Sequence, residues 1–387
     1  MIYLDHNAIT PVRPAAAAAV ARALDTFGNP SSPHAAGRAA RALLDGARAQ
    51  VAAALGARPG EIVFTSGATE SAALALRGVL GAAPPERREL VVTAVEHPCV
   101  LSLAEALAAA GAPLRVVPVD RRGLPDEEAW RAALSPRTAL ACAMLANNET
   151  GVVLPAPRLA AAAREVGALF FCDAVQAVGK LEVDVRTLGA DLLSLTGQKF
   201  GGPRGAGALF VRPGIPLAPL FGGHQERERR AGTENLPGIA GLAAALREAI
   251  AARAQEQPRI EALRDLLEAR LLAAWPGARV NGADAPRLPG TLSVTLPGCD
   301  AEALLIALDL EGICASAGSA CTSGSSAPSH VLSAMGLAPA DARATLRLSL
   351  GWNSTEAEVD AAAEAIPRLA ARVRDALAPE PSAGTPA

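Results

Sequence analysis

Short apolar runs alternate with alanine-rich stretches of helical period through the first half of the chain. Runs of strand length occur at residues 62–65, 90–93, 115–119, 140–145, 169–172, 192–195 and 208–211. Segments of helical period, such as 35–55, 71–78, 100–110 and 156–166, precede or separate these runs. Because strands that alternate with helices form βαβ units, the pattern predicts an α/β fold. We expect a mainly parallel, seven-stranded sheet with helices on both faces.

Two further features of the pattern refine this fold. The short Gly-rich segment 200–207 joins the last two predicted strands, which favours a hairpin and therefore one antiparallel strand. A long helical stretch over 236–275, interrupted by Pro258, marks the expected domain boundary. We expect a large domain over residues 12–255 and a smaller α+β domain built from 1–11 and 256–378. The Pro/Gly/Ser/Thr-rich residues 379–387 are expected to be disordered.

Composition and charge narrow the class of protein. The chain has 387 residues, half of them apolar and only 3% aromatic, with a net charge of -3. This length favours two domains, and the charge argues against direct nucleic-acid binding. No basic segment followed by an apolar run begins the chain, and no apolar run is long enough to cross a membrane. The six cysteines lack metal-ligand spacing. We therefore expect a cytoplasmic protein with reduced thiols and no bound metal.

Two strand ends carry candidate binding chemistry. In EIVFTSGATES (61–71) a strand leads through small residues into a helix, whose free N–H groups and the Thr69 hydroxyl can hold a phosphate or a carboxylate. The same pattern also fits an ordinary capped helix. In FFCD (170–173), Asp173 ends an apolar strand, where α/β folds bind ligands. Asp173 could keep the ring nitrogen of a cofactor protonated, or it could cap a helix over 174–179.

A lysine and a cysteine are candidates for covalent chemistry. Lys199 follows a buried strand and is flanked by glycines, and a desolvated lysine can form a Schiff base with an aldehyde. The alternative is a lysine in a surface turn. Cys321 lies in the small-residue loop 312–328, where an accessible thiol can act as a nucleophile. A buried structural thiol is the alternative, and it is the role we expect for Cys142 and Cys172.

Several motifs in register resemble the cysteine desulfurases of the class V aminotransferase branch of fold-type I enzymes that use pyridoxal phosphate (PLP). The resemblance runs from Tyr3 to the RLSLG segment at Arg347. It covers FGNPSS at 27–32, FTSGATES, the pair Glu96 and His97, NNETG at 147–151, DAVQAVGK at 173–180, RAGTEN at 230–235 and SAGSACTS at 316–323. It implies a PLP-dependent enzyme that converts L-cysteine to L-alanine and forms a persulfide on Cys321. The sulfur would then pass to an acceptor, a scaffold or carrier protein.

The resemblance also assigns roles to individual residues. Lys199 would carry PLP and act as the base, Asp173 would pair with the ring nitrogen, and His97 would stack on the ring and relay protons. Gln176 would approach the phenolic oxygen of the ring. The phosphate would be held by Ala68, Thr69, Thr196 and Gln198, and by Thr233 of the partner subunit, which implies a homodimer. Asn148 and Arg347 would bind the carboxylate of the substrate.

Two departures and two alternatives accompany this interpretation. Gln198 stands where the family usually has histidine, and a glutamine can donate to a phosphate but cannot carry charge. The chain also lacks the long C-terminal extension with which some members hold an iron–sulfur scaffold. A selenocysteine lyase, or another class V lyase, would be indifferent to replacement of Cys321. A PLP-fold protein that mainly binds a partner would show little turnover. The pathway served by the sulfur, including iron–sulfur cluster assembly and tRNA thiolation, stays open.

Overall fold

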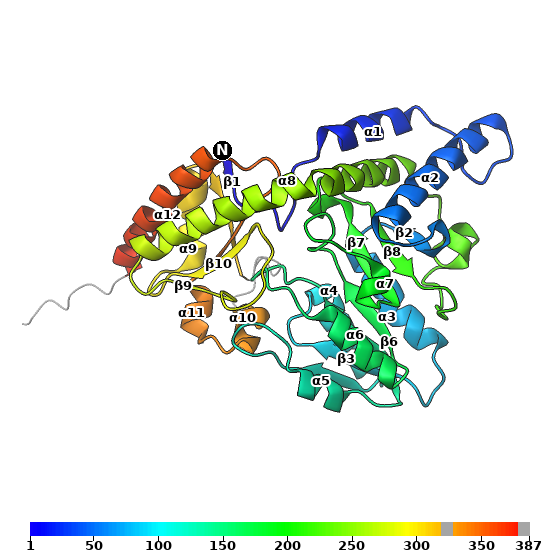
Figure 1. The fold of residues 1–387 in the computed structure, drawn as a ribbon, viewed down its shortest axis with the longest axis horizontal. Helices are drawn as coiled ribbons and strands as arrows, with labels where there is room; N and C mark the ends of the chain where they lie inside the picture. The colour runs from blue at the N-terminus through cyan, green and yellow to red at the C-terminus, as the bar shows by residue number, and fades with distance from the viewer. Residues whose placement is uncertain (319–327, 378–387) are drawn as a thin grey trace, which may run out of the picture.

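The computed structural model describes residues 1–318 and 328–377. Its largest sheet has seven strands in the order β2-β8-β7-β6-β5-β3-β4 (Figure 1). Neighbouring strands run parallel except β8, which is antiparallel to both β2 and β7. The seven-stranded, mainly parallel sheet and its one antiparallel strand are thus confirmed. The strands are β2 (Ile62–Thr65), β3 (Glu89–Thr93), β4 (Leu114–Val117), β5 (Thr138–Met144), β6 (Leu169–Asp173), β7 (Leu192–Thr196) and β8 (Gly207–Val211).

Helices cover both faces of this sheet, as predicted. Side chains alternate across a strand, so Leu192 packs on one face and Leu193 on the other. The Leu192 face is covered by α3 (Ala68–Ala82) and α4 (Pro98–Ala109). The Leu193 face is covered by α2 (Ala35–Ala54), α5 (Glu127–Ala133), α6 (Ala156–Glu165), α7 (Val185–Leu188) and the first half of α8, with α1 (Pro14–Leu24) packed on α8. Strand β4 ends at Val117, two residues earlier than predicted, because Pro118 has no N–H for the ladder.

A second hydrophobic core surrounds a smaller sheet. Its strands lie in the order β12 (Ser316–Ala317), β13 (Thr345–Ser349), β10 (Thr291–Thr295) and β9 (Arg279–Val280). The helices α9 (Ala301–Leu310) and α12 (Glu356–Leu377) pack here with the second half of α8. The remaining elements are β1 (Ile2–Tyr3), β11 (Ile313–Cys314), α10 (His330–Ala334), α11 (Pro339–Arg343), η1 (Pro59–Glu61), η2 (Gly197–Lys199) and η3 (Gln225–Glu228).

Helix α8 corrects one prediction. Pro258 was expected to interrupt the helical stretch, but α8 is one helix of 39 residues, Leu236–Ala274, with Pro258 inside it. Figure 1 shows α8 running from the large sheet to the small one. The division of the chain at residues 255 and 256 stays a prediction, and it falls within this helix. The predicted disordered tail over 379–387 lies outside the described residues.

Candidate active site

The carboxyl ends of parallel strands meet at one edge of the large sheet. Asp173 is the last residue of β6, and Lys199 follows β7 by one turn of η2. His97 and Asn148 follow the ends of β3 and β5 by four residues each. Because β3, β5, β6 and β7 are neighbours in the sheet, the fold brings these four predicted residues to the same edge.

Asp173 is a buried acid at the centre of this edge. Its Oδ1 accepts hydrogen bonds from the backbone N–H of Val175 at 3.0 Å and from the hydroxyl of Ser194 at 3.2 Å. Burial raises the pKa of Asp173, and the N–H of Val175, His97, Ser194 and Lys199 each oppose that rise. The residues after Asp173 form turns, not the helix that the capping alternative requires.

Lys199 is half-buried and directed inward. Its Nζ donates to the carbonyl oxygens of Asn7 and Ala8, each at 2.7 Å. The backbone N–H of Thr10 in turn donates to the carbonyl of Gln198 at 3.0 Å. The N-terminal segment of the chain therefore lies directly against η2. This placement contradicts the alternative of a lysine in a surface turn.

The first turn of α3 lies beside Thr196. A Cβ at Gly67, the residue before Ala68 and Thr69, would lie 3.6 Å from the hydroxyl oxygen of Thr196. That hydroxyl donates to Oε1 of Gln198 at 2.5 Å. The N-terminus of α3, the hydroxyl of Thr196 and the amide of Gln198 are therefore close together, and such a set suits an anion. We call these three groups the anion cradle. Of the residues predicted to hold a phosphate from within one chain, Thr196 and Gln198 are in contact, and Ala68 and Thr69 begin the helix beside them.

His97 caps the start of α4. Its Nδ1 accepts a hydrogen bond from the backbone N–H of Cys99 at 3.1 Å, so the neutral ring carries its hydrogen on Nε2. Burial lowers the pKa of His97; Lys199 and His330 act in the same direction, and Asp173 opposes them. The neutral form of His97 is therefore favoured at neutral pH.

Arg347 approaches this edge from the small sheet. The guanidinium is buried in β13, where it donates to Asp5 Oδ1 at 2.8 Å and to the backbone carbonyl of Asn148 at 3.3 Å. Its Nε is buried and has no hydrogen-bond partner among the described residues. The structure thus brings Arg347 and Asn148 together, as predicted for a carboxylate site, and within the described residues the Nε–H of Arg347 stays available to a ligand.

Two predicted residues are not part of this cluster. Thr233 is exposed, and within residues 1–318 and 328–377 no hydrogen bond joins it to Lys199 or Thr196. Cys321 lies outside the described residues. The predicted core thiols Cys142 and Cys172 are buried, as expected.

Sequence reasoning missed the contribution of the N-terminus to the site. Asn7 and Ala8 act through backbone carbonyls, which carry no side-chain signal. Asp5 was not predicted to be a site residue, although it pairs with Arg347. Lys180 was also missed as a separate residue: its Nζ donates to Gln176 Oε1 at 2.8 Å and to Asn7 Oδ1 at 3.1 Å. Its position four residues after Gln176, at the end of the DAVQAVGK motif, was the available signal.

The described residues contain no cluster that could hold a metal ion and no helix long and apolar enough to cross a membrane. The cluster instead combines a primary amine, a buried acid and an anion cradle. This donor set suits a ligand that carries an aldehyde, a basic ring nitrogen and a phosphate.

Comparisons with known proteins agree with this chemistry. The family model "Aminotransferase class-V" matches residues 2–362. A cysteine desulfurase of Gluconacetobacter diazotrophicus is 47% identical over 97% of this chain and 94% of its own length. The solved structure of a "NifS-like protein" covers 96% of this chain and 99% of its own, with a TM-score of 0.89 and 34% identity. A structure titled "SspA in complex with cysteine" covers 92% of this chain and 100% of its own, with a TM-score of 0.80 and 34% identity.

The fold and the matched family define a class V, PLP-dependent enzyme. Within that class the chain belongs to the cysteine desulfurases. The family resemblance and the fold class predicted from the sequence are confirmed.

Proposed function

We propose that this enzyme binds PLP on Lys199, removes the sulfur of L-cysteine onto Cys321 and passes it to an acceptor protein. The assignment of the site rests mainly on one observation: two neighbouring strands place an acid and an amine at the same edge of the large sheet. Asp173 and Lys199 end neighbouring parallel strands, and the anion cradle of α3 and Thr196 lies at the same edge. When bound, PLP supplies an electron sink that makes the Cα proton of an amino acid acidic.

The residues of the chain perform the remaining tasks. Asp173, acidic and buried, would pair with the ring nitrogen, and Gln176 would hold the phenolic oxygen. Arg347, with Asn148 beside it, binds the carboxylate of cysteine and orients the substrate. The amine of Lys199 would take the proton from Cα and return one to the carbon skeleton. His97, neutral and carrying its hydrogen on Nε2, would relay protons beside the cofactor.

Sulfur transfer balances without an external oxidant. The thiolate of Cys321 attacks the sulfur of the substrate, and a sulfur–sulfur bond forms as the carbon–sulfur bond breaks. The electron pair of the broken bond stays with carbon, which is protonated to the methyl group of alanine. A thiol of the acceptor protein then takes the outer sulfur and restores Cys321.

Reductive trapping tests the assignment of Lys199 directly. The sequence contains only two lysines, Lys180 and Lys199. Borohydride fixes a lysine–PLP linkage, so peptide mapping has two lysine side chains to choose between. We expect the label on the Lys199 peptide, and Lys199→Ala should lose the visible absorbance of lysine-bound PLP. A label on Lys180, or unchanged absorbance in Lys199→Ala, contradicts the assignment.

Replacement of Cys321 tests the sulfur transfer. Cys321→Ser should keep the colour of the enzyme and lose formation of the protein-bound persulfide. Cys314→Ser is the matched control, because Cys314 lies seven positions away in β11 and is half-buried. The control should release alanine from cysteine at the wild-type rate. Persistent persulfide formation in Cys321→Ser rules out the role of Cys321.

The proposed shared site makes a further prediction. If the exposed Thr233 completes the phosphate site of the partner subunit, then Thr233→Glu and Lys199→Ala should each be inactive alone. Mixed dimers would contain one native site, so reassociated mixtures should recover about one quarter of wild-type activity. No recovery in mixtures that demonstrably contain mixed dimers contradicts this arrangement. We also propose that the enzyme is cytoplasmic.

A further inference from the structure

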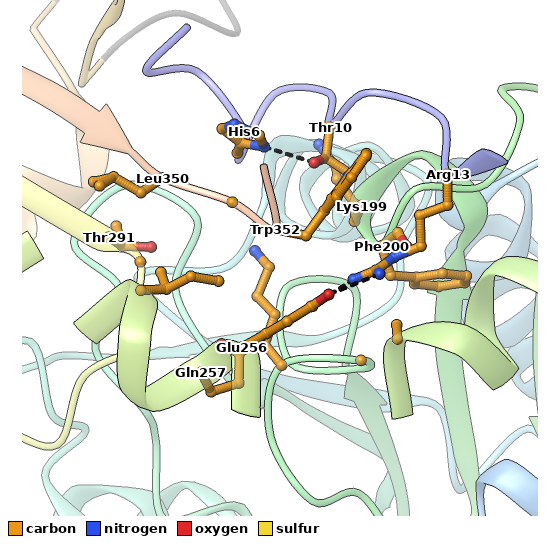
Figure 2. Close-up of a pocket in the computed structure, with 16 residues that line it drawn as sticks. His6, Thr10, Arg13, Lys199, Phe200, Glu256, Gln257, Thr291, Leu350 and Trp352 are labelled. Carbon is orange, nitrogen blue, oxygen red and sulfur yellow. Dashed lines mark hydrogen bonds and ion pairs between the residues drawn. The ribbon is translucent and has the colours of Figure 1, made fainter. Parts of the chain in front are cut away.

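Lys180 is a half-buried amine that has no role in the chemistry above. It follows the turns after β6 and lines a small pocket together with Lys199. The other walls of this pocket include His6, Thr10, Thr291 and Trp352 (Figure 2). Of the 36 basic residues in the sequence, only Lys180 and Lys199 are lysines, and all others are arginines. The chain otherwise uses arginine for its positive charges, so a general preference for lysine does not explain the residue at position 180.

The surroundings of Lys180 make it costly to bury. Within the described parts of the chain its Nζ forms no ion pair, and the oxygens it contacts belong to two neutral amides. Burial lowers the pKa of Lys180 to about 7, and the nearby charges of Lys199 and Arg347 act in the same direction. A methionine of similar length would fill the same space without this cost. Stability therefore does not account for the lysine either.

The contacts of Lys180 fix the orientation of two amide side chains. An amine at this position donates and, when charged, cannot accept. It therefore holds the oxygens Gln176 Oε1 and Asn7 Oδ1 toward itself and turns both amide nitrogens away. Gln176 Nε2 donates to the backbone carbonyl of Asn7 at 2.9 Å. The nitrogen of Asn7 donates to Thr291 at 2.9 Å and to the carbonyl of Asn148 at 3.2 Å.

These contacts link the two halves of the site. Asn7 O accepts from both Lys199 and Gln176, and the Asn7 side chain reaches the loop that carries Asn148. A reversed Gln176 amide would present an oxygen where an N–H now lies. Because Nε2 has two hydrogens and the Asn7 carbonyl takes one of them, the second stays available to a ligand. The orientation of one amide thus decides whether a ring oxygen meets a donor or an acceptor.

We propose that Lys180 is a positioning residue that locks Gln176 and Asn7 in the orientation required for binding PLP. The inference rests on the proposed function, since Gln176 is assigned there to the phenolic oxygen of PLP. Lys180 acts through Gln176 and is not itself the residue that carries the cofactor.

A double-mutant cycle tests this role. The variants are Lys180→Met, Gln176→Ala and the combination of both, each prepared without cofactor and then titrated with PLP. We expect Lys180→Met to bind PLP about tenfold more weakly and with an altered visible spectrum. The double variant should match Gln176→Ala in affinity to within about twofold, because residues that act as one unit are not additive. The thermal midpoint of Lys180→Met without PLP should equal or exceed that of the wild type.

The outcomes separate this inference from the proposed function. If wild-type protein forms no lysine-bound PLP, the proposed function fails. If the wild type does so and Lys180→Met has the same affinity and spectrum, only the positioning role is overturned. The positioning role is also overturned if the loss of PLP affinity in the double variant equals the product of the two single losses. Lys180 would then act independently of Gln176. Should Lys180→Met not fold, Lys180→Gln serves in the same cycle, and its spectrum decides by the same criteria.

Discussion

Glu96 is a carboxyl group enclosed by the core beside His97. Its Oε1 accepts from the hydroxyl of Thr93 at 2.6 Å and from the backbone N–H of Met144 at 2.9 Å. Its Oε2 is buried without a hydrogen-bond partner among the described residues. Burial raises the pKa of Glu96 to about 8; the two hydrogen bonds oppose the rise, and Asp173 adds to it. The protonated form therefore prevails at neutral pH.

Protonation of Glu96 makes the stability of the enzyme depend on pH. The carboxyl loses its proton near pH 4.5 when the chain is unfolded but keeps it to about pH 8 when folded. The folded state binds more protons in this window, so the contribution of Glu96 to stability declines as the pH rises through it. Glu96→Gln, which resembles the protonated acid, should be more stable than the wild type by a margin that grows from pH 5 to pH 8. Urea unfolding at both pH values measures the margin, and a constant difference contradicts the assigned protonation state.

At the scale of elements, Arg13 connects α1, α8 and the small sheet. The side chain is 5% exposed, and its two terminal nitrogens donate to Glu256 at 2.9 and 2.6 Å. Its guanidinium carbon lies 5.3 Å from the centre of the Trp352 ring. Glu256 lies two residues before Pro258. Because proline has no N–H, one backbone hydrogen bond of the helix is missing there. These contacts hold α8 across the position where the sequence alone predicts a break.

Loss of Arg13 should therefore destabilise the fold. Arg13→Met leaves Glu256 and Glu248 without their partner in a largely buried setting, so we expect a loss of roughly 2–4 kcal/mol in the free energy of unfolding. The control is Arg41→Met, because the pair of Arg41 with Asp45 is more than half exposed and should contribute no more than about 0.5 kcal/mol. Chemical denaturation of both variants gives the comparison. Equal effects at the two positions contradict the proposed link.

The sequence predicted correctly those elements that a short run of residues identifies by itself. Buried strands such as β6 and β7 read as apolar runs, and Asp173 and Lys199 stand at their ends. The continuity of α8 was not predictable, because the contacts that support Pro258 come from Arg13, far away in the sequence. The roles of Asn7 and Ala8 were hidden for another reason: a backbone carbonyl is the same at every residue. Lys180 was visible as a residue, but its contact with Asn7 was not, because Asn7 lies far away in the sequence.

At the scale of the molecule, the site lies between two hydrophobic cores, and the first ten residues cross from one to the other. β1 pairs with β11, and Asp5 bridges to Ser349 at the end of β13. A few residues later, Asn7 and Ala8 contact Lys199. A ligand at Lys199 is therefore coupled to the packing of both cores.

Removal of PLP should expose this coupling. A ligand at 100 times its dissociation constant stabilises the folded state by about 2.7 kcal/mol. We expect the protein stripped of PLP to melt at a lower temperature and to exchange backbone hydrogens faster at residues 5–10 and 197–199. Exchange in α12, which packs in the core of the small sheet, serves as the internal reference. An unchanged exchange pattern near Asn7 contradicts the coupling.

The pairing of β1 with β11 also has a consequence for biosynthesis. The ribosome makes residues 2 and 3 more than 300 residues before their partners, Ile313 and Cys314. Asp5 must wait still longer, for Arg347 and Ser349. The large sheet can form while synthesis continues, because its strands end at Val211. The N-terminal segment cannot be fixed against both cores until Arg347 and Ser349 have emerged, so we expect capture of the proposed cofactor to be a late step in maturation.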